Sequence, residues 1–173
     1  MEILKLIPPS LSYEKQIQSY KDEFIKHNED IHGSAGLAKA SSISAWINSI
    51  KSNSNEATVA EGLVTASTYI VIREDDDYLI GMIDIRHHLN DFLFRSGGHI
   101  GYSVRHSERN KGYAKEMLRL ALMECRDLNI KKVLVTCSKD NLASEKVILF
   151  HNGKFENSLL IDGKVQNRYW IDL

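Results

Sequence analysis

The residues best suited to chemistry form a short basic loop around Gly112. Arg105, Arg109 and Lys111 precede this glycine, and Lys115 follows it. If a helix begins after the loop, the N–H groups of its first turn have no partners inside the helix and lie at the positive end of its dipole. Such a place binds phosphate well, and glycine lacks the Cβ that would keep an anion from the backbone. The loop therefore predicts a polyphosphate site, although a tight turn among solvated charges would have the same composition.

The periodicity of the flanking residues predicts a strand before this loop and a helix after it. From 100 to 104 the side chains alternate in type, which is the two-residue period of a strand. From position 114 the period changes to three and four, as in an amphipathic helix whose apolar face is Ala114, Met117, Leu118, Ala121, Leu122 and Cys125. Neither the P-loop nor the dinucleotide-binding glycine pattern occurs in the loop.

The segment Arg109-Asn110-Lys111-Gly112-Tyr113-Ala114 resembles a known phosphate loop. It is similar to the Gln/Arg-x-x-Gly-x-Gly/Ala loop of the GCN5-related N-acetyltransferases (GNAT), which holds the pyrophosphate of acetyl-coenzyme A. Residues 100–105 resemble the central strand of that family, and residues 133–138 resemble its next strand. Asn141-Leu142-Ala143-Ser144 resembles the Asn-x-x-Ala/Ser that follows.

The resemblance to the order of the family's core extends roughly from Thr68 to the C-terminus. Residues 33–37, 97–99 and 168–170 also resemble one branch, the bacterial predicted acetyltransferases of undefined substrate. A chain of 173 residues suffices for one domain. We expect a single N-acetyltransferase domain over 1–173, in which 1–67 supplies a strand, helices and acceptor-side loops, and 68–173 forms the acetyl-coenzyme A-binding core.

The expected fold class is mixed α/β (α+β), with one mixed central sheet flanked by helices. Because strand, helix and strand follow in order, we expect the strands at 100–104 and 133–138 to be parallel with a right-handed crossover, splaying from each other. Helices are expected from a cap at Ser12, over 42–51 and from Asn141 to near Gly153, with loops at 52–67 and 89–96. The other expected strands are 3–7, 68–73, 78–87 and a hairpin of 155–161 with 165–173.

The splay would free backbone groups that an extended pantetheine arm can pair with, and whose N–H groups can polarise a thioester carbonyl. The resemblance implies this role for the backbone of Tyr102, Ser103 and Val104. It further implies coenzyme contacts from the phosphate loop and the next helix: Arg109, Asn110, Lys111, Gly112, Tyr113, Ala114, Asn141, Ser144 and Lys146. For Asn141 a plain helix N-cap is the alternative.

Acetyl transfer to an amine needs a base and a proton for the departing thiolate. His99 is the first candidate base, and its alternative is a histidine that bonds the end of the sheet. Asp84 is a candidate base or amine anchor, but a structural pair with Arg86 fits its spacing equally well. Many family members carry a tyrosine acid where this chain has Ile148, so Tyr169 and Tyr102 are substitutes.

The remaining features describe partners and exclude other classes of protein. By resemblance, Gly33 and Ser34 lie in the acceptor-binding region, and a surface turn is the alternative. His87 and His88 are adjacent, so in a strand they point to opposite faces and cannot share a metal; we expect none. A net charge of −1 argues against a nucleic-acid or membrane partner. The acceptor would be a small-molecule or peptide amine, and many relatives form homodimers.

Cys125 and Cys137 are expected to be buried thiols in a reducing compartment. With no signal peptide and no apolar stretch long enough to span a bilayer, the sequence predicts a cytoplasmic protein. The favoured function is an acetyl-coenzyme A-dependent N-acetyltransferase in which a primary amine attacks the thioester directly. Two alternatives stay open: an acyl-coenzyme A sensor of the same fold without turnover, and an unrelated α/β domain that binds a nucleotide.

Overall fold

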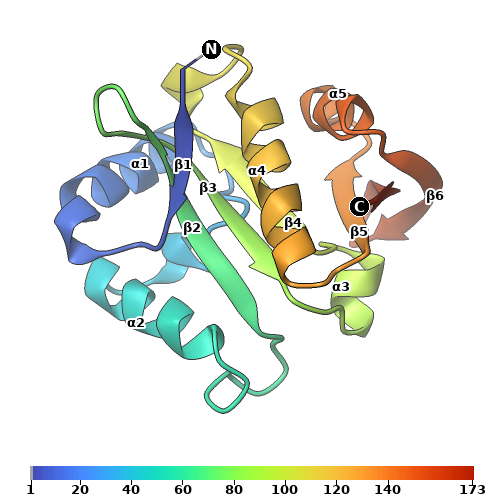
Figure 1. The fold of residues 1–173 in the computed structure, drawn as a ribbon, viewed down its shortest axis with the longest axis horizontal. Coiled ribbons are helices and arrows are strands. Elements are labelled where there is room, and N and C mark those ends of the chain that lie inside the picture. Colours follow the sequence, from blue (N-terminus) through green and yellow to red (C-terminus); the bar gives the residue numbers. More distant parts are fainter. Residues whose placement is uncertain (1) are drawn as a thin grey trace.

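Two antiparallel sheets form the framework of the computed structural model, which describes residues 2–173 (Figure 1). The first sheet has its strands in chain order: β1 (Leu4–Ile7), β2 (Ala66–Arg73), β3 (Tyr78–Arg86) and β4 (Ile100–Val104). The second sheet places the last strand in the middle: β5 (Lys132–Ser138), β7 (Lys164–Asp172) and β6 (Lys154–Ile161). The predicted hairpin at the C-terminus is confirmed as β6 and β7.

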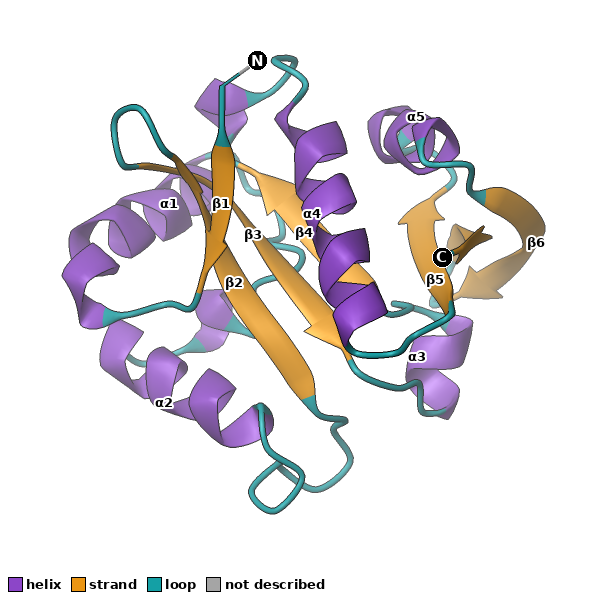
Figure 2. Ribbon diagram, viewed as in Figure 1, coloured by secondary structure: helices purple, strands orange, loops and turns teal. Residues whose placement is uncertain are grey.

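Helices cover both faces of the first sheet and continue over the second (Figures 1 and 2). On one face lie α1 (Glu14–Lys26) and α2 (Ile43–Asn53), and their apolar side chains form a core with β2 and β3. On the other face, α4 (Tyr113–Asp127) and α5 (Leu142–Phe150) share a second core with both sheets. The short α3 (Asp91–Arg95) precedes β4, and single 3-10 turns occupy Leu11–Tyr13, Leu37–Lys39 and His106–Glu108.

The ends of the helices differ in part from expectation. The Ser42 hydroxyl accepts the N–H of Ala45 at 3.0 Å and caps α2. The predicted cap at Ser12 is wrong, because Ser12 lies inside a 3-10 turn and its hydroxyl bonds Ser10 at 2.6 Å. The predicted loop at 89–96 contains α3, whose N-cap Asn90 accepts the N–H of Leu93 at 2.9 Å. A helix of five residues is too short to show a helical period in the sequence.

The predicted splay between β4 and β5 is confirmed, whereas the predicted parallel pairing is wrong. The two strands run in the same direction in Figure 2, yet they belong to different sheets. Among the described residues, their only bridge joins Gly98 and Val135, before β4 begins. A Cβ at Gly98, whose φ is 65°, would lie 2.3 Å from the carbonyl oxygen of Leu134. The two backbones therefore meet at Gly98 and His99 and then diverge.

Candidate functional site

The loop before α4 presents backbone N–H groups that the protein leaves open. Gly112 is the N-cap residue of α4 with φ 87°, and no side chain caps this end. The first bond of the turn joins the N–H of Lys115 to the carbonyl oxygen of Gly112 at 3.1 Å. Within residues 2–173, the N–H groups of Gly112, Tyr113 and Ala114 have no hydrogen-bond partner. A Cβ at Gly112 would meet no atom within 4 Å, so the space in front of these groups is open. Such an arrangement suits an anion.

Two cationic side chains of this loop, Arg109 and Lys111, are paired with carboxylates, which the sequence pattern did not indicate. Arg109 bonds both oxygens of Glu29, and its Nε donates to the carbonyl oxygen of Val104 at 3.1 Å. The ammonium of Lys111 lies 2.8 Å from Glu108. These two pairs leave as open donors the backbone N–H groups and the ammonium of Lys115, which lies 4.3 Å from the centre of the Phe150 ring.

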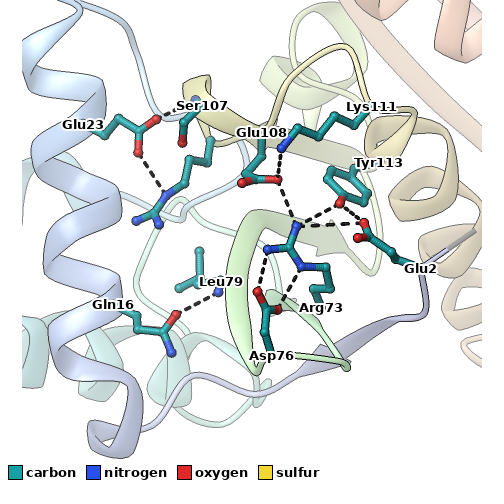
Figure 3. A network of polar contacts seen from close by, with 11 residues as sticks. Glu2, Gln16, Glu23, Arg73, Asp76, Leu79, Ser107, Glu108, Lys111 and Tyr113 are labelled. Atoms are coloured by element: carbon teal, nitrogen blue, oxygen red, sulfur yellow. Dashed lines mark hydrogen bonds and ion pairs between the residues drawn. The ribbon is translucent and has the colours of Figure 1, made fainter.

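Arg105 is buried and held on several sides. Its Nε lies 3.0 Å from Glu23, its Nη2 donates to Ser19 at 3.2 Å, and its guanidinium lies 4.7 Å from the centre of the Tyr78 ring. Glu23 also accepts the N–H of Ser107 at 2.7 Å (Figure 3). Arg105 therefore ties the start of the loop to α1 rather than offering a free donor.

The edge of β4 that faces β5 is not paired with another strand within residues 2–173. At the two ends of the β3–β4 ladder, Arg86 N–H bonds the oxygen of His99 at 2.7 Å and Arg105 N–H bonds the oxygen of Ile80 at 2.8 Å. In an antiparallel pair, alternate residues direct their backbone groups to the same neighbour. The groups of Tyr102 and Val104 therefore point away from β3 into the splay. The Val104 oxygen already accepts Arg109, whereas the two N–H groups remain available.

The side chain of Tyr102 crosses the splay to α5. Its hydroxyl and that of Ser144 lie 2.8 Å apart. Burial raises the pKa of Tyr102 to about 12, so the phenol keeps its proton at neutral pH. The Ser144 N–H donates to the side chain of Asn141 at 3.1 Å, so Asn141 caps α5. A helix N-cap was the alternative to a coenzyme contact for this residue. A pair of neutral hydroxyls thus lies beside the open edge of β4.

His99 is fixed between the sheets by two bonds to one residue. Its backbone N–H donates to the oxygen of Leu134 at 2.7 Å, and its Nδ1 accepts the N–H of Leu134 at 3.0 Å. Burial lowers the pKa of His99 to about 4, and the charges of Arg86 and His88 contribute. The ring is therefore neutral at pH 7 with its proton on Nε2. This is the bond to the sheet end that was the alternative to a catalytic base.

Asp84 and Tyr169, the other candidates from the sequence, also have close partners. Asp84 is buried, accepts the Thr68 hydroxyl at 2.8 Å and lies 2.8 Å from the Nε of Arg86. Tyr169 is buried and donates its hydroxyl to Glu145. Burial and this bond raise the pKa of Tyr169 to about 12. The Asp84–Arg86 pair matches the structural alternative considered for its spacing.

The turn at 33–36 packs directly on β4, on the face opposite Tyr102. A Cβ at Gly33, whose φ is 68°, would lie 2.2 Å from the carbonyl oxygen of Gly101. Ser34 is buried; its hydroxyl donates to the oxygen of Ile31 at 2.8 Å, and its own oxygen accepts the Trp46 indole N–H at 2.7 Å. The turn thus adjoins the open strand, while the Ser34 side chain points inward. Among residues 2–173, no group of histidines, cysteines and carboxylates is arranged to hold a metal.

The acidic residues and the arginine that contact the loop before α4 were not predicted from the sequence. Glu29 and Arg73 reach it from 80 and 35 residues away in the chain, and no sequence pattern marks such pairs. Glu108 was detectable in principle, because it lies three residues before Lys111.

Comparison with known proteins identifies the family. A family model described as an acetyltransferase (GNAT) domain matches residues 16–149. No curated protein matches the chain. Among solved structures, RimJ from Mycobacterium smegmatis in complex with a coenzyme A disulfide aligns with a TM-score of 0.70 at 16% identity, covering 99% of this chain and 82% of that one.

Two further structures align over nearly the whole chain. The acetyltransferase from Salmonella typhimurium that modifies the N-terminal serine of ribosomal protein L7/L12 aligns with a TM-score of 0.67 at 17% identity, covering 98% and 95% of the two chains. The spermidine/spermine N-acetyltransferase SpeG from Vibrio cholerae gives 0.66 at 15% identity, covering 98% and 93%. Identities this low show the fold alone. With the family model matching most of its length, the chain belongs to the GNAT acetyltransferase family.

Proposed function

We propose that this protein transfers the acetyl group of acetyl-coenzyme A to a primary amine by direct attack. The observation that carries the proposal is the combination of two open sets of backbone donors at either end of one segment. These are the N–H groups of Tyr102 and Val104 at the splay, and those of residues 112–114 at the start of α4. An extended, amide-containing chain with a pyrophosphate at its far end matches both sets.

Acetyl-coenzyme A would supply the reactive thioester, and the residues present fit it. The unpartnered N–H groups of Gly112, Tyr113 and Ala114 would receive the pyrophosphate, and the edge of β4 would pair with the pantetheine amides. Several structural neighbours of this chain were solved with acetyl-coenzyme A or coenzyme A bound, among them RimJ from Mycobacterium smegmatis. This supports a coenzyme of the same class here.

In the proposed reaction the amine nitrogen forms a bond to the carbonyl carbon, and the carbon–sulfur bond breaks. A β4 N–H group would stabilise the negative charge that develops on the carbonyl oxygen. The thiolate then takes a proton. The neutral hydroxyl pair of Tyr102 and Ser144, beside the open edge, is the donor that the geometry favours over Tyr169, whose hydroxyl is directed at Glu145.

The amine must lose a proton to become the amide. His99 Nδ1 is occupied by a backbone N–H, and the Asp84 carboxylate is occupied by Thr68 and Arg86. We therefore assign to His99 and Asp84 a role in positioning β4. Solvent water would accept the proton that the amine loses. The acceptor would enter on the face where the Gly33 turn lies against Gly101, opposite α4 and α5.

The test is thiol release from acetyl-coenzyme A with a panel of amines: polyamines, amino acids and peptides with free N-termini. Release that depends on one amine, together with that amine's acetylated product in mass spectrometry, is the expected result. Firm binding of acetyl-coenzyme A without release for any amine would instead support the acyl-coenzyme A sensor. Stabilisation by ATP but not by coenzyme A in a thermal-shift assay would contradict the proposal.

A further inference from the structure

Arg73, at the end of β2, is the centre of a polar network below the phosphate loop (Figure 3). Its Nε and Nη2 hold the two oxygens of Asp76 at 2.8 and 2.6 Å. Its Nη1 bonds Glu108 at 3.1 Å and the Tyr113 hydroxyl at 2.9 Å. Glu108 precedes the phosphate loop and Tyr113 begins α4, so one guanidinium nitrogen contacts both ends of the loop.

Glu108 shares its Oε2 atom between two cations. Arg73 Nη1 lies 3.1 Å from it and Lys111 Nζ lies 2.8 Å from it. The Glu108 side chain is only 11% exposed, so its carboxylate needs a partner at all times. The Arg73 side chain is 14% exposed and anchored by Asp76, whereas that of Lys111 is 49% exposed on a flexible stem. Of the two cations, Lys111 is the one that can move.

Lys111 directly precedes the open N–H groups of the phosphate loop. The bond to Glu108 raises the pKa of Lys111, so its ammonium remains charged. A charge-assisted bond to a pyrophosphate oxygen is available to this ammonium only if it leaves Glu108. If Lys111 were the sole partner of Glu108, its departure would strand a nearly buried carboxylate, which is strongly unfavourable.

We propose that Arg73 is a positioning residue that keeps Glu108 paired, so that Lys111 is free to leave it for the coenzyme pyrophosphate. The inference rests on the proposed function, because it names what the proposed phosphate site does with its lysine. Arg73 itself does not contact the coenzyme in this account. Without Arg73, Glu108 retains Lys111 and the phosphate site loses one donor.

The test is a double-mutant cycle on coenzyme A affinity, measured at one fixed salt concentration. Lys111→Met should weaken binding about tenfold in the wild-type background, the size of one charge-assisted bond. In the Arg73→Met background the same change should have almost no effect, because Glu108 already retains Lys111. In the Arg73→Met, Glu108→Gln background, where no carboxylate holds the lysine, the tenfold effect should return.

Two comparisons separate this account from a general loss of structure. Pantetheine lacks the pyrophosphate, so its affinity should be the same with and without Lys111. Arg73→Lys keeps a cation on Glu108 with little change in volume, and should keep the tenfold effect of Lys111→Met even if Arg73→Met folds poorly. An equal effect of Lys111→Met in the Arg73→Met and wild-type backgrounds would overturn the inference. Wild-type protein that does not bind coenzyme A would overturn the proposed function instead.

Discussion

The phosphate loop and the junction between β4 and β5 are both rich in polar groups, but they leave different kinds of group open. At the loop, the side chains of Arg109 and Lys111 are paired and the backbone N–H groups are free. At the junction, His99 bonds backbone groups of Leu134, and the open groups belong to the neighbouring edge of β4. In both regions these side chains are bonded within the protein, and the open donors belong to the backbone.

The junction between β4 and β5 depends on the side chain of His99. Replacing His99 with Ala leaves the Leu134 N–H without its acceptor and opens a cavity, so we expect a loss of about 2–4 kcal/mol in the free energy of unfolding. Urea denaturation measures this loss. If His99 serves only the junction, variants that stay folded should retain their turnover per bound coenzyme. A folded variant with normal coenzyme affinity and no turnover would restore His99 as a base.

The pH dependence of stability provides a related test of His99. The pKa of His99 is lowered to about 4 in the folded chain. Between about pH 4 and the ordinary pKa of about 6.5, the unfolded chain therefore binds the proton more readily than the folded chain. The contribution of neutral His99 to the free energy of unfolding is therefore complete above about pH 6.5 and is lost as the pH falls toward 4. Relative to His99→Gln, the wild type should lose about 1–3 kcal/mol of stability between pH 7 and pH 4. Parallel pH curves for the two proteins would contradict the assignment.

The contact between the turn at 33–36 and β4 predicts a different effect for two glycines three residues apart. Gly33→Ala combines a positive φ with a Cβ 2.2 Å from the Gly101 oxygen, whereas a Cβ at Gly36, also at positive φ, meets nothing within 4 Å. We expect Gly36→Ala to cost about 1 kcal/mol of stability from backbone strain alone, and Gly33→Ala to cost about 2 kcal/mol more. Equal midpoints in thermal unfolding would show that the turn does not press on β4.

The smallest expected effect on stability concerns the hydroxyl pair beside the open edge. Tyr102→Phe removes one bond to Ser144 and should lower the free energy of unfolding by about 1 kcal/mol. If the pair protonates the thiolate, kcat should fall about tenfold or more while the KM for acetyl-coenzyme A stays similar. Tyr169→Phe is the matched control and should leave kcat unchanged. The opposite pattern would move the proton donor to Tyr169.

The loop between β4 and α4 was predictable because the pattern that defines it is local. A strand period, a glycine and a helix period follow one another within residues 100–127, and the structure has β4, the loop and α4 there. The partners of the loop were not predictable, because Glu29 and Arg73 come close only once α1 and β2 have packed. Sequence alone thus located the strand, the loop and the helix, but overestimated the free positive charge of the loop.

The junction shows the same limit for pairing between strands. The order of strand, helix and strand indicates how β4 and β5 are connected along the chain. It does not indicate whether the edges of the two strands form hydrogen bonds with each other. A bridge at Gly98 and two bonds at His99 join the sheets. Beyond them β4 diverges from β5 and does not pair with it. The histidine was visible as a candidate, but its bond to Leu134 was not.

The affinities of Gly112→Glu and Gly163→Glu for coenzyme A test the proposed phosphate site at the start of α4. Both glycines have positive φ and open space where a Cβ would lie, but Gly163 belongs to the turn between β6 and β7. Both variants therefore carry similar backbone strain and the same added charge. The account predicts that Gly112→Glu weakens binding at least about a hundredfold, since it places a carboxylate at the phosphate site, while Gly163→Glu binds like the wild type. Unchanged affinity in Gly112→Glu would contradict it.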